Sequence, residues 1–127
     1  MCNLLNTIFV ACNLASAQPV ELTPPVLQQV ESALNNTMMD FVYPAEVPFA
    51  QMGCTFPSVL SRKGELIGDI DCEGIKGSYE AKVTKASRSL PQGTCSQLLA
   101  MEGQGPLRTH QTCGNLNIDL TIATTTR

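Results

Sequence analysis

Residues Cys54–Cys72 read CTFPSVLSRKGELIGDIDC, and residues Cys95–Cys113 read CSQLLAMEGQGPLRTHQTC. Each stretch begins and ends with a cysteine. Both ends of the second stretch follow those of the first by 41 residues, since position 54 corresponds to 95 and position 72 to 113. The two stretches therefore have the same length, and one offset relates them throughout.

A fixed offset between similar segments is the sequence signature of an internal repeat. The same offset aligns three further pairs of like residues, Thr55 with Ser96, Gly64 with Gly105 and Leu66 with Leu107. The sequence therefore predicts a two-copy repeat with units 54–94 and 95–127. The alternative is chance, because two gaps of similar length are not rare among four cysteines.

The first 17 residues, MCNLLNTIFVACNLASA, contain no Lys, Arg, Asp or Glu. Their apolar run leads to Ala15-Ser16-Ala17, which has the small-x-small pattern that signal peptidases cut. We therefore expect residues 1–17 to be a signal peptide and residues 18–127 to form a single small domain. The alternative is a bacterial lipoprotein with its lipid on Cys12.

Cleavage after Ala17 would leave four cysteines, at positions 54, 72, 95 and 113. An even number of cysteines in a small exported chain indicates disulfides. We therefore expect two disulfides in a secreted, extracellular protein, or in a periplasmic one if the source is bacterial. Four cysteines allow three pairings, and the repeat favours Cys54–Cys72 with Cys95–Cys113, which closes one loop within each unit.

The segment that follows residue 22 predicts an amphipathic helix. Thr23 can cap it, and a proline suits the first turn because its missing N–H would have no partner there. Apolar side chains then recur every four residues, at Val26, Val30, Leu34 and Met38. This period predicts a helix of about four turns that ends near residues 35–37 and packs on a sheet.

Alternation of apolar and polar residues predicts strands farther along the chain. The expected strands are 65–72, 78–86, 107–112 and 116–122, with a short helix at 96–101. The expected fold class is α+β. One N-terminal amphipathic helix packs on a small antiparallel sheet of about four strands, and two disulfides stabilise the domain.

Residues 40–57 form an apolar connector that Pro44, Pro48 and Pro57 stiffen. A connector of this kind either lies across the core or forms an exposed binding surface. Its candidate contact residues are Phe41, Tyr43, Val47, Phe49, Met52 and Phe56. Surface loops often carry function, so we expect the loops 60–64 and 87–94 to extend this surface.

A different candidate site lies at residues 69–80, where acidic residues recur as they do in a calcium-binding EF-hand loop. Its candidate ligands are Asp69, Asp71, Glu73 and Glu80. Lys76 stands where such loops usually hold an aliphatic residue, and no helical pattern precedes the segment. Solvent-facing acids beside a hairpin turn are therefore the stronger interpretation.

The net charge is −3, and residues 1–61 contain no Lys or Arg. The chain lacks the basic excess that phosphate binding requires, which argues against a nucleic-acid partner. His110 is the single histidine, and oxidised cysteines cannot ligate zinc or act as nucleophiles. We expect no catalytic residues, no cofactor and no membrane span in the mature domain.

These features predict a small secreted, disulfide-stabilised protein that is not an enzyme. It would bind a protein or surface partner, as an effector, an inhibitor or a structural component. The first alternative is a calcium-binding extracellular module that uses residues 69–80. The second is a small secreted hydrolase with a cleft around His110. The identity of the partner and the oligomeric state stay open.

Overall fold

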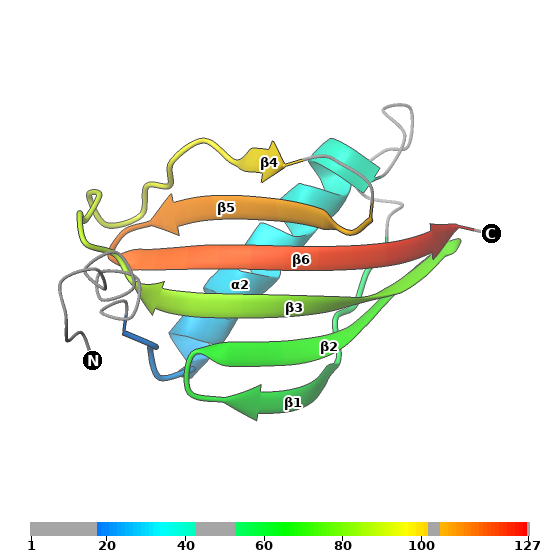
Figure 1. The fold of residues 1–127 in the computed structure, drawn as a ribbon, viewed down its shortest axis with the longest axis horizontal. Coiled ribbons are helices and arrows are strands. Elements are labelled where there is room, and N and C mark those ends of the chain that lie inside the picture. The colour runs from blue at the N-terminus through cyan, green and yellow to red at the C-terminus, as the bar shows by residue number, and fades with distance from the viewer. Residues whose placement is uncertain (1–17, 43–52, 102–104, 127) are drawn as a thin grey trace, which may run out of the picture.

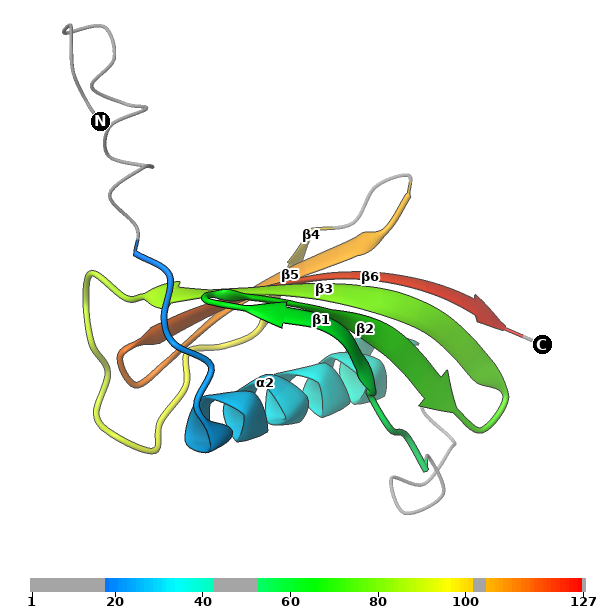
Figure 2. The same cartoon turned by 90° about the horizontal axis from the view of Figure 1, so that it is seen from below.

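The structure is a computed structural model of the 127-residue chain, and it describes residues 18–42, 53–101 and 105–126. The described chain folds into one helix and one antiparallel sheet (Figure 1). The elements are α2 (Pro24–Thr37), continued by the π-helical turn η2 (Met38–Val42), then β1 (Ser58–Arg62), β2 (Glu65–Cys72), β3 (Ile75–Lys85), β4 (Leu99–Met101), β5 (Leu107–Cys113) and β6 (Leu116–Thr126). The helix lies across one face of the sheet (Figure 2).

The α+β class and the two disulfides are confirmed, but the predicted number of strands was wrong. The sheet has six strands, in the order β1-β2-β3-β6-β5-β4. The two unpredicted strands are at its edges. All five residues of β1 are exposed, so their side chains do not alternate between core and solvent. Strand β4 covers only three residues.

The short helix predicted at residues 96–101 was also wrong. Residues 99–101 instead pair antiparallel with β5, with Leu99 opposite His110 and Met101 opposite Arg108. A run of this length fits either secondary structure, because apolar periodicity cannot separate a helix from a strand over so few residues. The long-range pairing with β5 decides the outcome.

The two halves of the sheet follow one plan, with the same offset of 41 residues. Strand β3 occupies 75–85 and β6 occupies 116–126, so both ends differ by that offset. β1-β2-β3 and β4-β5-β6 each form a three-stranded meander, and β3 pairs with β6 between them. In that pairing Glu80 lies opposite Thr121, its own counterpart under the offset. A pseudo-two-fold axis therefore passes between these two residues and relates the two meanders.

The core forms where the helix meets the inner face of the sheet. Strand β2 alternates as predicted, with Leu66, Ile70 and Cys72 buried and Asp69 and Asp71 exposed. Strands β3 and β6 direct Tyr79, Ala81, Val83, Leu116, Ile118, Leu120 and Ile122 to the same face. Across from them α2 and η2 bury Val30, Ala33, Leu34 and Met38. Each fully buried Leu, Ile or Val side chain stabilises the fold by about 1.5–3 kcal/mol relative to an exposed one.

The ends of α2 differ in part from the sequence prediction. Thr23 occupies the N-cap position with Pro24 and Pro25 after it, but its side chain makes no capping hydrogen bond. At the other end the hydroxyl of Thr37 donates to the Ala33 carbonyl at 2.8 Å, which lets a fully buried polar residue sit in the helix. The chain then continues into η2 and buries Met38.

Both disulfides join an edge segment to the end of a neighbouring strand. Cys54 is bonded to Cys72 and Cys95 to Cys113, which are the pairs that the repeat favours. Their Cα atoms lie 4.1 and 4.0 Å apart. Such close spacing marks residue pairs that face each other without backbone hydrogen bonds of their own. In the first pair the backbone bonds fall on the adjacent residues, Thr55 and Asp71, at 2.8 and 3.0 Å.

Removing either disulfide should destabilise the protein to the same extent. Both loops span 18 residues, so the chain-entropy model assigns each closure about 3 kcal/mol. We expect the double substitutions Cys54→Ala with Cys72→Ala, and Cys95→Ala with Cys113→Ala, each to lower the free energy of unfolding by about that amount. Urea denaturation of the two variants measures this. A large loss in one variant and none in the other would contradict the equal-loop argument.

Candidate functional site

Two grooves flank α2, one on each side of the line where the helix meets the sheet. The first, which we call the α2–β1 groove, has a volume of about 240 Å³. Its apolar wall consists of Leu27, Val30, Leu34, Phe56, Leu66 and Tyr79. Its polar lining consists of Glu31, Ser58 and Ser61, so Glu31 is the one charged residue among the described residues that line it.

The floor of the α2–β1 groove is built around Tyr79, which is 3% exposed. The Phe56 ring meets the Tyr79 ring edge to face, with centroids 6.2 Å apart. The Tyr79 hydroxyl donates to the Phe56 carbonyl at 3.3 Å. Gly68 makes this possible, because a Cβ atom there would overlap both the Pro57 carbonyl and the phenol ring. Burial, followed by the charges of Asp69 and Glu31, raises the pKa of Tyr79 above its ordinary value.

Strand β1 forms the outer rim of this groove and also an edge of the sheet. Within the described chain it pairs with β2 alone, so alternate N–H and C=O groups of residues 60–62, past a β-bulge between Ser58 and Leu60, face away from the sheet. Val59 is 70% exposed and Leu60 43% exposed, and Leu27 is exposed on the helix opposite. Apolar side chains and unpaired main-chain groups therefore meet along one edge.

The structure places only two of the six predicted contact residues. Phe56 lies in the α2–β1 groove, half-buried against the core, and Phe41 is exposed on η2. The predicted residues Tyr43, Val47, Phe49 and Met52 lie outside the described residues. The sequence analysis missed Leu27 and Val59, and it assigned Leu60 to a loop at 60–64, whereas residues 60–62 belong to β1. The adjacent apolar residues Val59 and Leu60, followed by Ser61 and then Arg62-Lys63, were the signal that could have indicated an exposed edge.

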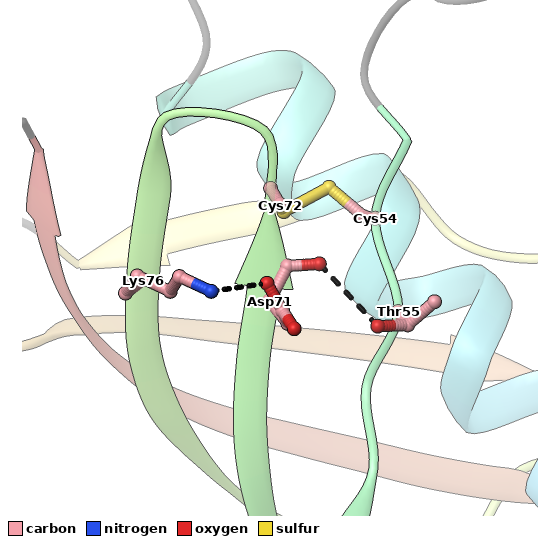
Figure 3. The surroundings of a disulfide bond; sticks show 5 residues. All are labelled: Cys54, Thr55, Asp71, Cys72 and Lys76. Atoms are coloured by element: carbon pink, nitrogen blue, oxygen red, sulfur yellow. Dashed lines mark hydrogen bonds and ion pairs between the residues drawn. A yellow bond between two sulfur atoms is a disulfide. The ribbon is translucent and has the colours of Figure 1, made fainter.

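The acidic residues at 69–80 lie along the β2–β3 hairpin, where Cys72 pairs with Ile75 across a two-residue turn. Lys76 lies opposite Asp71, and its ammonium is 2.7 Å from the carboxylate (Figure 3). Among the residues that the structure describes, no three His, Cys, Asp or Glu side chains are grouped closely enough to hold a metal ion. The hairpin geometry therefore favours the interpretation that these acids face solvent beside a turn. It gives no support to a calcium site formed by Asp69, Asp71, Glu73 and Glu80.

The outer face of the sheet, away from the helix, carries a row of ionisable side chains. Arg62, Glu65, Lys82, Asp119 and His110 are successive cross-strand neighbours. Arg62 Nε lies 2.7 Å from Glu65 Oε1, and His110 Nδ1 lies 2.5 Å from Asp119 Oδ1. Neither groove beside α2 is lined by His110.

The second groove, which we call the α2–β5 groove, lies on the opposite side of the helix and has a volume of about 400 Å³. The helix contributes amide and hydroxyl side chains to it, and the sheet contributes Gln111 and the second disulfide. Gln111 is 7% exposed. Two residues away on the same face is Thr109, whose Oγ1 is the one buried side-chain polar atom without a hydrogen-bond partner in the described part of the chain.

No family model, no characterised protein and no solved structure matches the chain significantly. Over residues 18–42, 53–101 and 105–126, no helix is long and apolar enough to cross a membrane.

The ion pair between Arg62 and Glu65 should be visible in the titration of the carboxyl group. The hydrogen bond from Arg62 lowers the pKa of Glu65 below its ordinary value of 4.5. A lowered pKa in the folded state stabilises the protein above the unfolded pKa, and this stabilisation is lost as the pH falls through the folded pKa. We expect Arg62→Gln to raise the pKa of Glu65 towards 4.5, as measured by carbon NMR of the carboxyl group. Lys76→Gln is the control and should leave Glu65 unchanged.

Two threonines of β5 should respond in opposite ways to the loss of their hydroxyls. The Thr109 hydroxyl is buried without a partner, so Thr109→Val should raise the free energy of unfolding by about 1 kcal/mol. The Thr112 hydroxyl donates to Asn117 Oδ1 at 2.7 Å, so Thr112→Val should lower it by about 1 kcal/mol. Thermal and urea unfolding of the two variants provide the comparison. A loss of stability in Thr109→Val would show that this hydroxyl has a partner.

Proposed function

We propose that this protein is exported and acts by binding a protein partner, through an extended segment of that partner that adds to β1. The observation that carries the proposal is the meeting of an open sheet edge with an apolar groove. Peptides that join a sheet edge gain affinity from main-chain hydrogen bonds and specificity from pockets for alternate side chains. Strand β1 offers the main-chain hydrogen bonds, and the α2–β1 groove offers the pockets for side chains.

The side chains around the groove indicate the chemistry of the partner. Leu27 presents exposed apolar surface in the groove and Val59 presents it on the edge strand, which favours apolar side chains in the bound segment. Glu31 is the one charge in the groove lining, and it favours a Lys or Arg at one position of that segment. The partner strand would therefore alternate apolar residues and carry one basic residue opposite α2.

The two disulfides support this function through rigidity. The Cys54–Cys72 bond fixes the segment that leads into β1, and Phe56 on that segment forms part of the groove wall. A wall held in place before binding has less conformational entropy to lose when a partner docks. A small domain stabilised by disulfides is therefore suited to recognition outside the cell.

Selection from a random peptide library displayed on phage tests the proposal. We expect the native protein to enrich peptides that alternate apolar residues and contain a Lys or Arg. Val59→Lys should remove binding, because a charge on an edge strand opposes strand addition. Glu31→Lys should shift the selected charge from basic to acidic.

Ser78→Lys is the matched control, because Ser78 is exposed in β3 rather than on the edge. It should leave the enriched sequences unchanged. Enrichment that does not depend on Val59 and Glu31, or no enrichment at all, would refute a peptide site at β1.

A further inference from the structure

The two halves of the sheet differ on their inner faces at equivalent positions. Under the offset of 41, Ile70 in β2 corresponds to Gln111 in β5, and Gly68 corresponds to Thr109. Ile70 is 1% exposed and Gln111 is 7% exposed, so both side chains lie inside. One scaffold position therefore holds an apolar side chain in one half and an amide in the other.

At such a buried position an isoleucine contributes more to stability than an amide does. Burying a polar side chain costs free energy unless hydrogen bonds compensate it, whereas the isoleucine in the other half is stabilising. Thr109, the neighbouring inward residue of β5, keeps a buried hydroxyl without a partner in the described chain. Residues that break a local packing rule in this way are expected where a protein has a function to perform.

The surroundings of Gln111 indicate what that function is. It lines the α2–β5 groove, whose opposite wall is a stripe of exposed polar residues on the helix. The polar side chains of the groove are Gln28, Gln29, Ser32, Asn36, Thr94 and Gln111. Every described residue that lines this groove is uncharged, in a chain that carries 11 acidic and eight basic residues.

We propose that the α2–β5 groove binds a neutral oligosaccharide. Each side-chain amide offers both a donor and an acceptor, and each hydroxyl offers both as well. Sugar hydroxyls have the same dual capacity, so the groove and a neutral sugar can satisfy each other completely. Pro25 and the Cys95–Cys113 disulfide add small apolar surfaces for the C–H faces of the rings.

The groove suits other ligands less well. Among the described residues of the lining, an anionic ligand would find no Lys, Arg or His, and a cationic ligand would find no Asp or Glu. A peptide segment needs pockets for its alternate side chains, and the lining contains no large apolar side chain to form them. This site lies on the opposite flank of α2 from the groove proposed for a protein partner, so the two proposals stand independently.

An array of immobilised glycans, both neutral and anionic, tests the proposal with the disulfide-bonded protein. We expect binding to neutral glycans alone. Gln111→Ile, which gives β5 the residue that β2 has at the equivalent position, should reduce the affinity at least about tenfold while the free energy of unfolding stays equal or rises. Gln28→Ala with Gln29→Ala is the second variant, and it should keep the fold because alanine favours helices.

Ser78→Ala on the outer face of β3 is the control and should bind as the native protein does. Nitrogen–proton NMR of the native protein with the bound glycan should shift the amides of residues 28–36 and 94–95 and those of residues 111–114. Absence of binding to any neutral glycan, equal binding of anionic glycans, or full affinity in both groove variants would overturn the proposal. Shifts in this groove on adding peptides selected by phage display would assign the site to a peptide instead.

Discussion

The pairing of β3 with β6 is the interaction on which the rest of the structure depends. Both strands have 11 residues, and they pair along their full length, from Ile75 opposite Thr126 to Lys85 opposite Leu116. This ladder joins the two halves of the chain, and its inner face supplies most of the apolar surface under α2. The register of this pairing also sets the position of the pseudo-two-fold axis. A shift of one residue would turn every buried side chain of one half to solvent, so burial specifies the register strongly. Both grooves therefore take their positions from this one pairing.

The sheet is pseudo-symmetric, but the single helix that covers it is not, so the two halves of the sheet have different surroundings. The helix has two flanks, and the two halves present different walls to them. On one flank the sheet offers Leu66 and Tyr79, and the groove is apolar with a single acid. On the other flank it offers Gln111 beside the second disulfide, and the groove is polar and uncharged. The same strand layout thus produces two different surfaces, because the two halves carry different inward-facing residues at equivalent positions.

The sequence predicted those parts of the fold that have a local period. The helix was apparent from Val26, Val30 and Leu34, and the long strands from alternation such as that from Leu116 to Ile122. Strands β1 and β4 could not be predicted in this way, because their positions depend on pairing with strands elsewhere in the chain rather than on a pattern of their own. The grooves were beyond prediction for the same reason. Phe56 was selected as an apolar connector residue, yet its role in a wall depends on Tyr79 and on the lack of a side chain at Gly68, both distant in sequence.

The helix carries polar side chains of different kinds on its two flanks. This difference decides which substitutions in the helix affect which groove. Residues 18–42 contain Glu21, Glu31 and Asp40 but no Lys or Arg, so the helix adds only acidic charge to its surroundings. Glu31 directs that charge to the α2–β1 groove, while Gln28, Gln29 and Ser32 leave the other flank neutral. Val30 and Leu34 belong to the core and also line the α2–β1 groove, whereas Ala33, which is buried as well, lines the α2–β5 groove. A substitution on one flank would therefore alter one groove and spare the other. Binding at the two grooves can accordingly be separated by mutation even though a single helix builds both.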